Sequence, residues 1–419
     1  IENGDHAQAS HNDIYDIRST GEFIGSGIHS INTNGATYLS NTIHDTQWDG
    51  IRVDRGRGVL ATHNTISDVT RTGIFLGNTG SALVSNNIIS GAGRSGVNVS
   101  GGTFAIISRN TISHRGLNGV LLSYAKAAAV LGNNISRTGL NGIYADNSTD
   151  AFVDSNRIYN TGANGISFYN SARGFIERNV IGVDGADQNI AGDGVRLERS
   201  NRTQVNQNQI TNTKSTAFNV GSGIQSIDSN NVLLQRNEIW DTAWDGIRID
   251  KGDNVSALNN EISYATRTGV YLGEASNSGV SGNIIAHVGR SGVNVSSGAD
   301  NLISENDIQY TGLNGILLSY AGRATVDHNS IQQTGLNGIY VDHSAGAKII
   351  NRNTIQQTGA HGVAVVDSGN VEVSESLISN TAGSGVFVDP SPDAKILRNY
   401  IDLTRSHGIT VLNSSGATI

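Results

Sequence analysis

A dipeptide of Gly followed by Ile or Val returns along the whole 419-residue chain at a nearly constant interval, which is 23 from Gly27 to Gly50. The interval is 24 once, from Gly338 to Gly362, and 29 twice, from Gly165 to Gly194 and from Gly194 to Gly223. The glycines that mark these units are Gly27, Gly50, Gly73, Gly96, Gly119, Gly142, Gly165, Gly194, Gly223, Gly246, Gly269, Gly292, Gly315, Gly338, Gly362, Gly385 and Gly408. A period of about 20 to 50 residues is typical of architectures in which each unit packs on its neighbours.

A second marker, Asn followed after one residue by Ile or Val, runs in step with the first. Asn133 and Asn329 keep its register, and Ser376 breaks it. The marker occurs at Asn12, Asn41, Asn64, Asn87, Asn110, Asn156, Asn179, Asn208, Asn237, Asn260, Asn283, Asn306, Asn353 and Asn399. We expect these side chains to point inward at a turn and to bond the units above and below them.

Each unit reads as short strands joined by turns. Apolar residues alternate over three to five positions, and Gly, Asn, Ser and Asp separate them. No unit has room for an amphipathic helix. The sequence therefore predicts an all-β, right-handed parallel β-helix with about 17 coils of about 23 residues each, a period within the range of solenoid repeats. A leucine-rich repeat is the rival solenoid, but it needs a different Leu pattern. The unit count excludes a closed propeller, which has about four to eight blades.

A longer repeat is superposed on the short one. WDGIRVD at 48–54 returns as WDGIRID at 244–250, and RSGVNVS at 94–100 returns unchanged at 290–296, so the offset is 196. We expect one continuous β-helix over 1–419 with an internal duplication of about 12–207 and 208–403. Extra residues predict loop insertions near 13–26, 180–193 and 209–222. Descent alone explains such a duplication; two equivalent binding sites are the functional alternative.

Composition excludes several classes of protein. The chain has no Cys and therefore no disulfide framework or Cys-based metal site. A net charge of −8 without a basic run argues against nucleic acid as the main partner. No run of about 18 apolar residues predicts a membrane span. The opening residues are no signal peptide. Both ends lack capping features, so we expect a segment of a longer protein or of an assembly with further coils, associating end to end or laterally.

Stacked coils turn the sequence into a surface map. With the repeating Gly as position zero, +1 and +3 are expected to point inward, and −1, +2 and +4 to point outward or to lie at the strand edge. The −2 column is read as part of the same exposed face. The outer columns combine aromatic, Arg and Asp residues. These candidate ligand-binding residues are Trp48, Asp49, Arg52, Asp54, Arg71, Phe75, Arg94 and Tyr144 in the first copy and Trp244, Asp245, Arg248, Asp250, Arg267, Tyr271, Arg290 and Tyr340 in the second.

This surface is suited to an acidic polysaccharide. Aromatic rings stack on sugar faces, and Arg guanidinium groups bind carboxylates or sulfates in bidentate contacts. Asn and Asp side chains form hydrogen bonds with hydroxyls. The alternatives are that Trp48 simply packs beneath a loop and that Asp49, Arg52 and Asp54 form a solvated ion-pair cluster. A protein-binding face is a further alternative.

Catalysis is an alternative function. A polysaccharide lyase or a uronate C5-epimerase needs a group that neutralises the carboxylate, a base and an acid. Arg52, Arg71 and Arg94 are candidates for the first role, and Tyr144 or Asp49 for the others. No cofactor is expected apart from Ca²⁺, for which the acidic stretch 184–194 offers Asp184, Asp187 and Asp193 as weak candidate ligands.

The Asn-x-Ile and Gly-Ile-x-Val cadence resembles the superfamily of right-handed parallel β-helix proteins. That superfamily includes pectate lyase-like enzymes, alginate epimerase modules, phage tailspikes and surface adhesins. The Tyr-Gly-x-Asp-Pro-His type motif of alginate epimerases is absent, since the only prolines are Pro390 and Pro392. The resemblance thus implies the fold and carries over no catalytic residue. We expect an extracellular or cell-surface rod that binds acidic polysaccharide as part of an adhesin, matrix or filament, with a lyase, an epimerase or a pure scaffold as alternatives.

Overall fold

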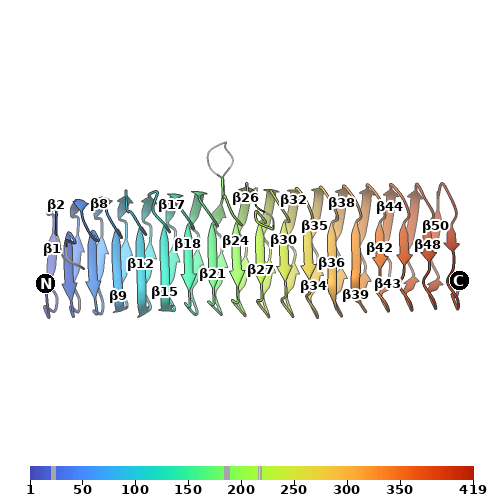
Figure 1. Cartoon of the computed structure of the whole chain (residues 1–419), viewed down its shortest axis with the longest axis horizontal. Coiled ribbons are helices and arrows are strands. Elements are labelled where there is room, and N and C mark those ends of the chain that lie inside the picture. The colour runs from blue at the N-terminus through green and yellow to red at the C-terminus, as the bar shows by residue number, and fades with distance from the viewer. Residues whose placement is uncertain (20–24, 184–188, 216, 218) are drawn as a thin grey trace. The chain divides into compact units, whose positions relative to one another are not determined.

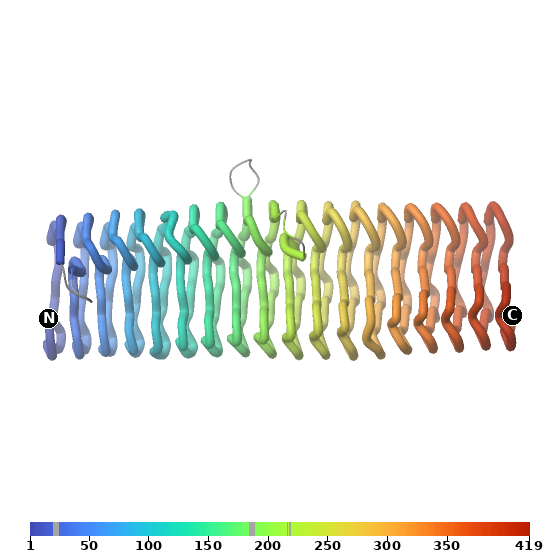
Figure 2. Tube along the Cα trace, viewed as in Figure 1, coloured from blue at the N-terminus to red at the C-terminus, as the bar shows by residue number. Residues whose placement is uncertain are grey.

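A computed structural model describes residues 1–19, 25–183, 189–215, 217 and 219–419 (Figures 1 and 2). The chain divides into two compact units, Ile1–Ser215 (unit 1) and Thr216–Ile419 (unit 2). The described residues form no helix, so none of them provides a helix long and apolar enough to cross a membrane.

Unit 1 is built from three parallel sheets, to which each coil contributes one short strand apiece. Sheet A contains β3 (Ile28–Ile31), β6 (Ile51–Asp54), β9 (Ile74–Gly80), β12 (Val97–Thr103), β15 (Val120–Lys126), β18 (Ile143–Asp146), β21 (Ile166–Tyr169) and β24 (Val195–Glu198). Sheet B contains β1 (Gln8–Ser10), β4 (Thr37–Leu39), β7 (Leu60–Thr62), β10 (Leu83–Ser85), β13 (Ile106–Ser108), β16 (Ala129–Leu131), β19 (Phe152–Asp154), β22 (Phe175–Glu177) and β25 (Gln204–Asn206). Sheet C contains β2 (Asp13–Ile17), β5 (Thr42–Thr46), β8 (Thr65–Val69), β11 (Ile88–Ser90), β14 (Thr111–Ser113), β17 (Asn134–Thr138), β20 (Arg157–Thr161), β23 (Val180–Ile181) and β26 (Gln209–Thr213).

Unit 2 has the same three-sheet plan. Its sheet A contains β27 (Ile224–Ile227), β30 (Ile247–Asp250), β33 (Val270–Gly273), β36 (Val293–Ala299), β39 (Ile316–Gly322), β42 (Ile339–Asp342), β45 (Val363–Val366), β48 (Val386–Asp389) and β51 (Ile409–Val411). Its sheet B contains β28 (Leu233–Gln235), β31 (Ser256–Leu258), β34 (Gly279–Ser281), β37 (Leu302–Ser304), β40 (Thr325–Asp327), β43 (Lys348–Ile350), β46 (Glu372–Ser374) and β49 (Lys395–Leu397). Its sheet C contains β29 (Glu238–Thr242), β32 (Glu261–Ala265), β35 (Ile284–Val288), β38 (Asp307–Thr311), β41 (Ser330–Thr334), β44 (Thr354–Thr358), β47 (Leu377–Thr381) and β50 (Tyr400–Asp402).

Strand pairing follows the sequence repeat. Val97 of β12 pairs with Val120 of β15, one period later, and Ile339 of β42 pairs with Val363 of β45 across the single longer interval between Gly338 and Gly362. Equal positions of successive coils therefore stack, and the predicted parallel β-helix is confirmed in each unit. The first residues of the segments 13–26, 180–193 and 209–222, where insertions are predicted, belong to the sheet C strands β2, β23 and β26.

The core is formed by the alternating apolar residues. Ile51 and Val53, at positions +1 and +3, are fully buried, as predicted. The repeating Gly has a steric cause: a Cβ on Gly50 would lie 2.6 Å from Ile66 Cγ2 and 2.7 Å from the Gly73 carbonyl oxygen. Only Gly lets the chain enter sheet A this close to the neighbouring coil.

The Asn column is the predicted inward ladder. Asn41, Asn64, Asn87, Asn110 and Asn156 are all buried. Each Asn donates its side-chain and backbone N–H groups to the amide oxygen of the next Asn; the two bonds from Asn87 to Asn110 Oδ1 are both 2.9 Å. Buried backbone groups at this turn are therefore hydrogen-bonded from coil to coil.

The side chains at position −1 do not lie where the sequence predicts them. They lie inside rather than on the surface: Asp49, Thr72 and Asn118 are all buried. Asp49 Oδ1 accepts the N–H of Thr72 in the next coil, and Asn118 Oδ1 accepts the N–H of Asn141. Position −1 precedes the strand, so the strand's in–out alternation does not apply to it, and its side chains cap backbone groups as a second polar ladder.

Candidate functional site

Three predicted site residues of unit 1, Asp49, Arg52 and Asp54, form one ion-pair cluster. Arg52 Nη1 lies 3.0 Å from Asp49 Oδ2, and its Nε and Nη2 donate to the two oxygens of Asp54 at 2.7 and 3.0 Å. The guanidinium also lies 4.2 Å from the ring centroid of Phe75. Arg52 and Asp49 are buried, which corrects their predicted surface positions. The alternative interpretation as an ion-pair cluster is confirmed, but the cluster is largely shielded from water rather than solvated.

Unit 2 repeats this arrangement closely. Arg248 pairs with Asp245 at 3.0 Å and with Asp250 at 2.7 Å, and it lies 4.2 Å from the ring centroid of Tyr271. Asp245 and Arg248 are buried, against the prediction. Both Arg side chains are engaged by carboxylates of the chain itself. They are therefore poor candidates for a ligand's carboxylate, and Asp49 is a poor candidate for a catalytic base.

A third copy of this arrangement explains Asp193. This residue also occupies position −1; it is fully buried, and its carboxylate lies 3.3 Å from Arg196 Nη1. Arg196 in turn pairs with Glu198 at 3.2 Å. Asp193 thus has an ion-pair partner within the chain. The other two calcium candidates, Asp184 and Asp187, lie outside the described residues, so the Ca²⁺ site stays a prediction.

Position −2 forms a ridge of Trp, Arg and Leu in each unit. The Arg71 guanidinium stacks 4.0 Å from the Trp48 ring centroid, and Arg267 stacks 4.2 Å from that of Trp244. Arg94 is exposed. The exposed residues Leu117 and Leu140 continue the ridge in unit 1; the twin ridge of unit 2 contains Trp244, Arg267, Arg290, Leu313 and Leu336.

The stacked Arg residues are only half-buried, yet part of each guanidinium is shielded. Arg71 Nε and Nη1 and Arg267 Nε are buried without a hydrogen-bond partner. Burial lowers the pKa of both Arg71 and Arg267, and the Asp49 or Asp245 carboxylate partly offsets that effect. The ridge brings Trp48, Arg71 and Arg94 together without Asp49 and Arg52, and its role in ligand binding stays a prediction.

The two predicted Tyr candidates lie apart from the Arg residues. Tyr144 and Tyr340, at position +2, are half-buried on sheet A. Burial raises the pKa of both hydroxyls, and the Asp146 or Asp342 carboxylate acts in the same direction. A raised pKa keeps Tyr protonated and is the opposite of what a general base needs near neutral pH.

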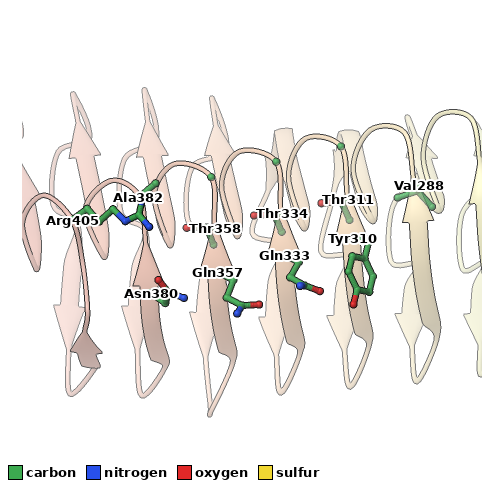
Figure 3. Close-up of a pocket in the computed structure, with 13 residues that line it drawn as sticks. Val288, Tyr310, Thr311, Gln333, Thr334, Gln357, Thr358, Asn380, Ala382 and Arg405 are labelled. Carbon is green, nitrogen blue, oxygen red and sulfur yellow. The ribbon is translucent and has the colours of Figure 1, made fainter.

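Sequence reasoning missed a groove of unit 2, which we call the amide groove (Figure 3). Its volume is about 740 Å³, and it follows the corner where sheet C ends. Gln333, Gln357 and Asn380 succeed one another from coil to coil along it, with Tyr310 at one end and Arg405 at the other. The side chains of these three amides are exposed, and Tyr310 is 45% exposed.

Three glycine turns, followed in the same column by Ala382 and Arg405, also line the amide groove. The glycines are Gly312, Gly335 and Gly359, and a Cβ on any of them would lie 2.1–2.2 Å from a carbonyl oxygen of the preceding coil. Thr334 and Thr358 form the floor, where their hydroxyls donate to backbone oxygens at 3.2 Å. Close stacking of the glycine turns thus excludes side chains from this column at the three glycine coils.

An aromatic stack leads into the amide groove. Tyr264, His287 and Tyr310 occupy the same left-handed turn position in successive coils. Their ring centroids are 5.1 and 4.5 Å apart, and the rings are nearly parallel. The positions of unit 1 that correspond to His287, Tyr310 and Gln333 hold Gly91, His114 and Arg137. The duplication therefore did not preserve this column.

One cluster of described residues has the composition of a metal site. Ligand atoms of Asp342, His343 and Asp367 lie within 4.8 Å of one another. His343 Nδ1 is 2.7 Å from Asp342, and its ring stacks on Tyr320. The cluster is half-buried to exposed, and its carboxylate–imidazole contact is satisfied without an ion.

The fold and these surfaces define a β-solenoid with grooves along its coils, and the chain belongs to the right-handed β-helix family. The family model, a right-handed β-helix region, matches the chain in overlapping segments at residues 1–139, 49–186, 141–285, 222–376 and 268–419. No curated protein matches the sequence.

Several solved structures are similar to the chain. The A-module of the mannuronan C-5 epimerase AlgE6 from Azotobacter vinelandii is 14% identical; the match covers 78% of this chain and 91% of that one, with a TM-score of 0.41. DFA-IIIase from Arthrobacter chlorophenolicus A6, without its lid, is 14% identical over 71% of this chain and 84% of that one, with a TM-score of 0.48. A double mutant of the tailspike protein of the E. coli bacteriophage HK620, in complex with a pentasaccharide, is 12% identical over 93% of this chain and 73% of that one, with a TM-score of 0.49.

Proposed function

We propose that this chain is a β-helical module that binds a linear, acidic polysaccharide. The amide groove carries the proposal. It is open and runs across successive coils, so that a chain-like ligand meets the same kind of group at each coil. Such a module suits an adhesin, matrix or filament component outside the cell or at its surface, and that setting is part of the proposal.

The chemistry of the groove matches that of a sugar chain. Side-chain amides offer a donor and an acceptor at once, as vicinal hydroxyls require. Tyr310 adds an amphipathic ring. Arg405 is the only charged residue lining the groove, and it forms no ion pair within the described part of the chain. Its guanidinium can therefore receive a carboxylate or sulfate of the ligand.

Binding is better supported than bond cleavage. The described lining of the amide groove includes no carboxylate and no His. A glycosidase needs two carboxyl groups, and a lyase needs a base within reach of its proton. A lyase or epimerase therefore remains the alternative that an assay must address, and a pure scaffold is the other.

The test is binding of oligosaccharides to the full chain. A glycan array followed by calorimetry with hexasaccharides of galacturonate, mannuronate and glucose should give saturable binding, with a preference for an acidic hexamer. The double variant Gln333→Ala, Gln357→Ala should weaken binding at least about tenfold, since each amide loses hydrogen bonds to the ligand.

A matched control uses the neighbouring glutamines. Gln332 and Gln356 lie one residue earlier on β41 and β44 and do not line the groove. The double variant Gln332→Ala, Gln356→Ala should bind like the parent. Equal losses in both double variants, or no binding by any glycan, would contradict the proposal. Appearance of an unsaturated uronate product, detected by its ultraviolet absorbance, would instead favour the lyase.

A further inference from the structure

A second groove, in unit 1, has different chemistry. It lies at the turn between sheets A and B, has a volume of about 530 Å³, and is lined by Asn32, Arg55, Arg57 and Asn78 together with Asn34, Thr79, Thr103 and three glycines. We call it the arginine groove. None of the described residues that line it is acidic.

Arg55 and Arg57 are both exposed, and neither forms an ion pair within the described residues. In another turn between the same two sheets, by contrast, Arg173 is held by Asp150 at 2.7 Å. The nearby Asp54 is already engaged by Arg52 and also lies 3.0 Å from His29. The two guanidinium groups of the groove are thus available to an external anion.

The coil neighbours position Arg57. Asn34 Oδ1 accepts its backbone N–H at 3.1 Å, while Asp5 holds the Asn34 amide at 3.0 Å. The aliphatic part of the Arg57 side chain lies against Gly80, because a Cβ added to Gly80 would lie 3.3 Å from Arg57 Cγ. A Cβ on Gly102 would lie 2.3 Å from the Thr79 carbonyl oxygen. Glycine at both places keeps the groove open beside the guanidinium.

Comparison with unit 2 shows that the β-helix fold does not require the positive charges of Arg55 and Arg57. At the offset of the duplication, Arg55 and Arg57 correspond to Lys251 and Asp253. Asn32 and Asn78 correspond to the two further acids Asp228 and Glu274. Two positive charges in unit 1 are therefore replaced by one positive and three negative charges. This reversal contrasts with the ion-pair cluster of Arg52 and Arg248, which both units keep.

We propose that the arginine groove binds a carboxylate or sulfate group of an acidic saccharide. The forked donors of Arg55 and Arg57 contact the anionic group, and the exposed Asn32 and Asn78 bond neighbouring hydroxyls. The class of ligand rests on the proposed function, whereas the site itself is separate from the amide groove. Unit 1 thereby has a candidate site for an acidic group in addition to its ridge.

Calorimetry on the full chain tests this site, with a galacturonate hexasaccharide and a chondroitin sulfate hexasaccharide as probes and a glucose hexasaccharide as the neutral reference. The double variant Arg55→Gln, Arg57→Gln should lose at least about tenfold in affinity for one of the charged probes. Binding of that probe by the parent should weaken as salt rises, and this dependence should become shallower in the variant. The substitution Lys251→Gln, at the corresponding position of unit 2, should leave binding unchanged.

Three other outcomes would contradict the arginine groove, the proposed function or the class of ligand. If the Arg variant binds both charged probes like the parent while the Gln333 and Gln357 variant loses binding, the arginine groove is overturned and the proposed function stands. If no hexasaccharide binds to the parent, both fail. If a single-stranded DNA of matched charge binds the arginine groove as tightly as either saccharide, the groove is a general polyanion site and the saccharide assignment is wrong. Equal circular dichroism spectra and melting temperatures establish that the variants are folded.

Discussion

At the scale of single residues, the buried side chains of position −1 link each coil to the next, as Asp49 does through the backbone N–H of Thr72. Alternation within a strand correctly put Ile51 inside, yet its extension to position −1 put Asp49 outside. The signal that was missed is compositional. Position −1 is held almost throughout by small hydrogen-bonding residues, as the Asn column is, and such constancy is typical of an inward ladder.

The first prediction concerns the buried ion pairs. Replacing Arg52 or Arg248 with Ala leaves the buried Asp49 or Asp245 without its counter-charge. We expect a loss of about 3–5 kcal/mol in the free energy of unfolding, the range for breaking a buried pair from one side. Urea denaturation measures it. The exposed Arg94→Ala should change stability by no more than about 0.5 kcal/mol. Comparable small effects for all three variants would show that the pairs are solvated.

The second prediction concerns pH. His114 Nδ1 accepts the Gly116 N–H at 3.0 Å, and Nε2 lies 3.0 Å from the Asn118 carbonyl oxygen; His361 Nδ1 accepts the Ser384 N–H. Burial lowers the pKa of both imidazoles, and backbone hydrogen bonds offset only part of that effect. The folded state therefore favours neutral His, whereas the unfolded chain takes up a proton below about pH 6.5.

It follows that this contribution to stability is complete above about pH 6.5 and is lost as pH falls toward the lowered folded-state pKa values. Unfolding free energies at about pH 7.5 and pH 5 should differ more in the parent than in His114→Gln or His361→Gln. The exposed His63→Gln serves as the control and should keep the parent's pH dependence. A parent profile that is flat over this range would contradict the prediction.

At the scale of elements, the short sequence period was enough to predict the coil, its strands and its Asn ladder. In a solenoid, each coil contacts the coils one period before and after it in the sequence. The sequence period therefore determines the register of the strands. The sequence period does not predict where the grooves lie. The amide groove depends on the left-handed turn at Gln333 and on how closely the glycine turns of adjacent coils stack, neither of which the repeat pattern reveals.

The break in the Asn ladder gives a third prediction. Ser376 donates its backbone N–H to Asn399 Oδ1, but its hydroxyl bonds only the Ser374 carbonyl oxygen. The change Ser376→Asn restores the side-chain link to Asn399 that other coils have. We expect a gain of about 0.5–1.5 kcal/mol, the usual net value of a hydrogen bond. Asn110→Ala, which removes an intact link, should lower the melting temperature; a loss from both changes would mean that the site cannot hold Asn.

A fourth prediction concerns the glycine side of the amide groove. Gly335→Ala places a methyl group 2.2 Å from the Gly312 carbonyl oxygen, so the coils must separate locally. We expect destabilisation of about 1–3 kcal/mol, the cost typical of overpacking. Gly322→Ala is the control, since nothing lies within 4 Å of its added Cβ. Thermal unfolding compares the two variants, and equal melting temperatures would show that the turn has room.

At the scale of the whole molecule, the two units share a plan but differ on their surfaces. Cores, ladders, ridges and the ion-pair clusters recur, whereas the turn columns that line the grooves have diverged, as His114 against Tyr310 and Arg57 against Asp253 show. The duplication was therefore a sound guide to what stabilises the fold and a poor one to where the grooves lie. Two equivalent sites remain a prediction for the ridges alone.

The last prediction tests the ridges. Arg94 and Arg290 are exposed, and Arg71 and Arg267 have guanidinium nitrogens without a partner. The measurement is affinity of the full chain for a long uronate polymer in the variants Arg71→Ala with Arg94→Ala, Arg267→Ala with Arg290→Ala, and all four together. Each double variant should bind more weakly, and the quadruple variant most weakly, because two equivalent sites on one chain add avidity. Added salt should weaken the parent more than the quadruple variant, since fewer charges remain to be screened. Parent-like binding by all three would make the ridges ordinary surface and leave recognition to the grooves.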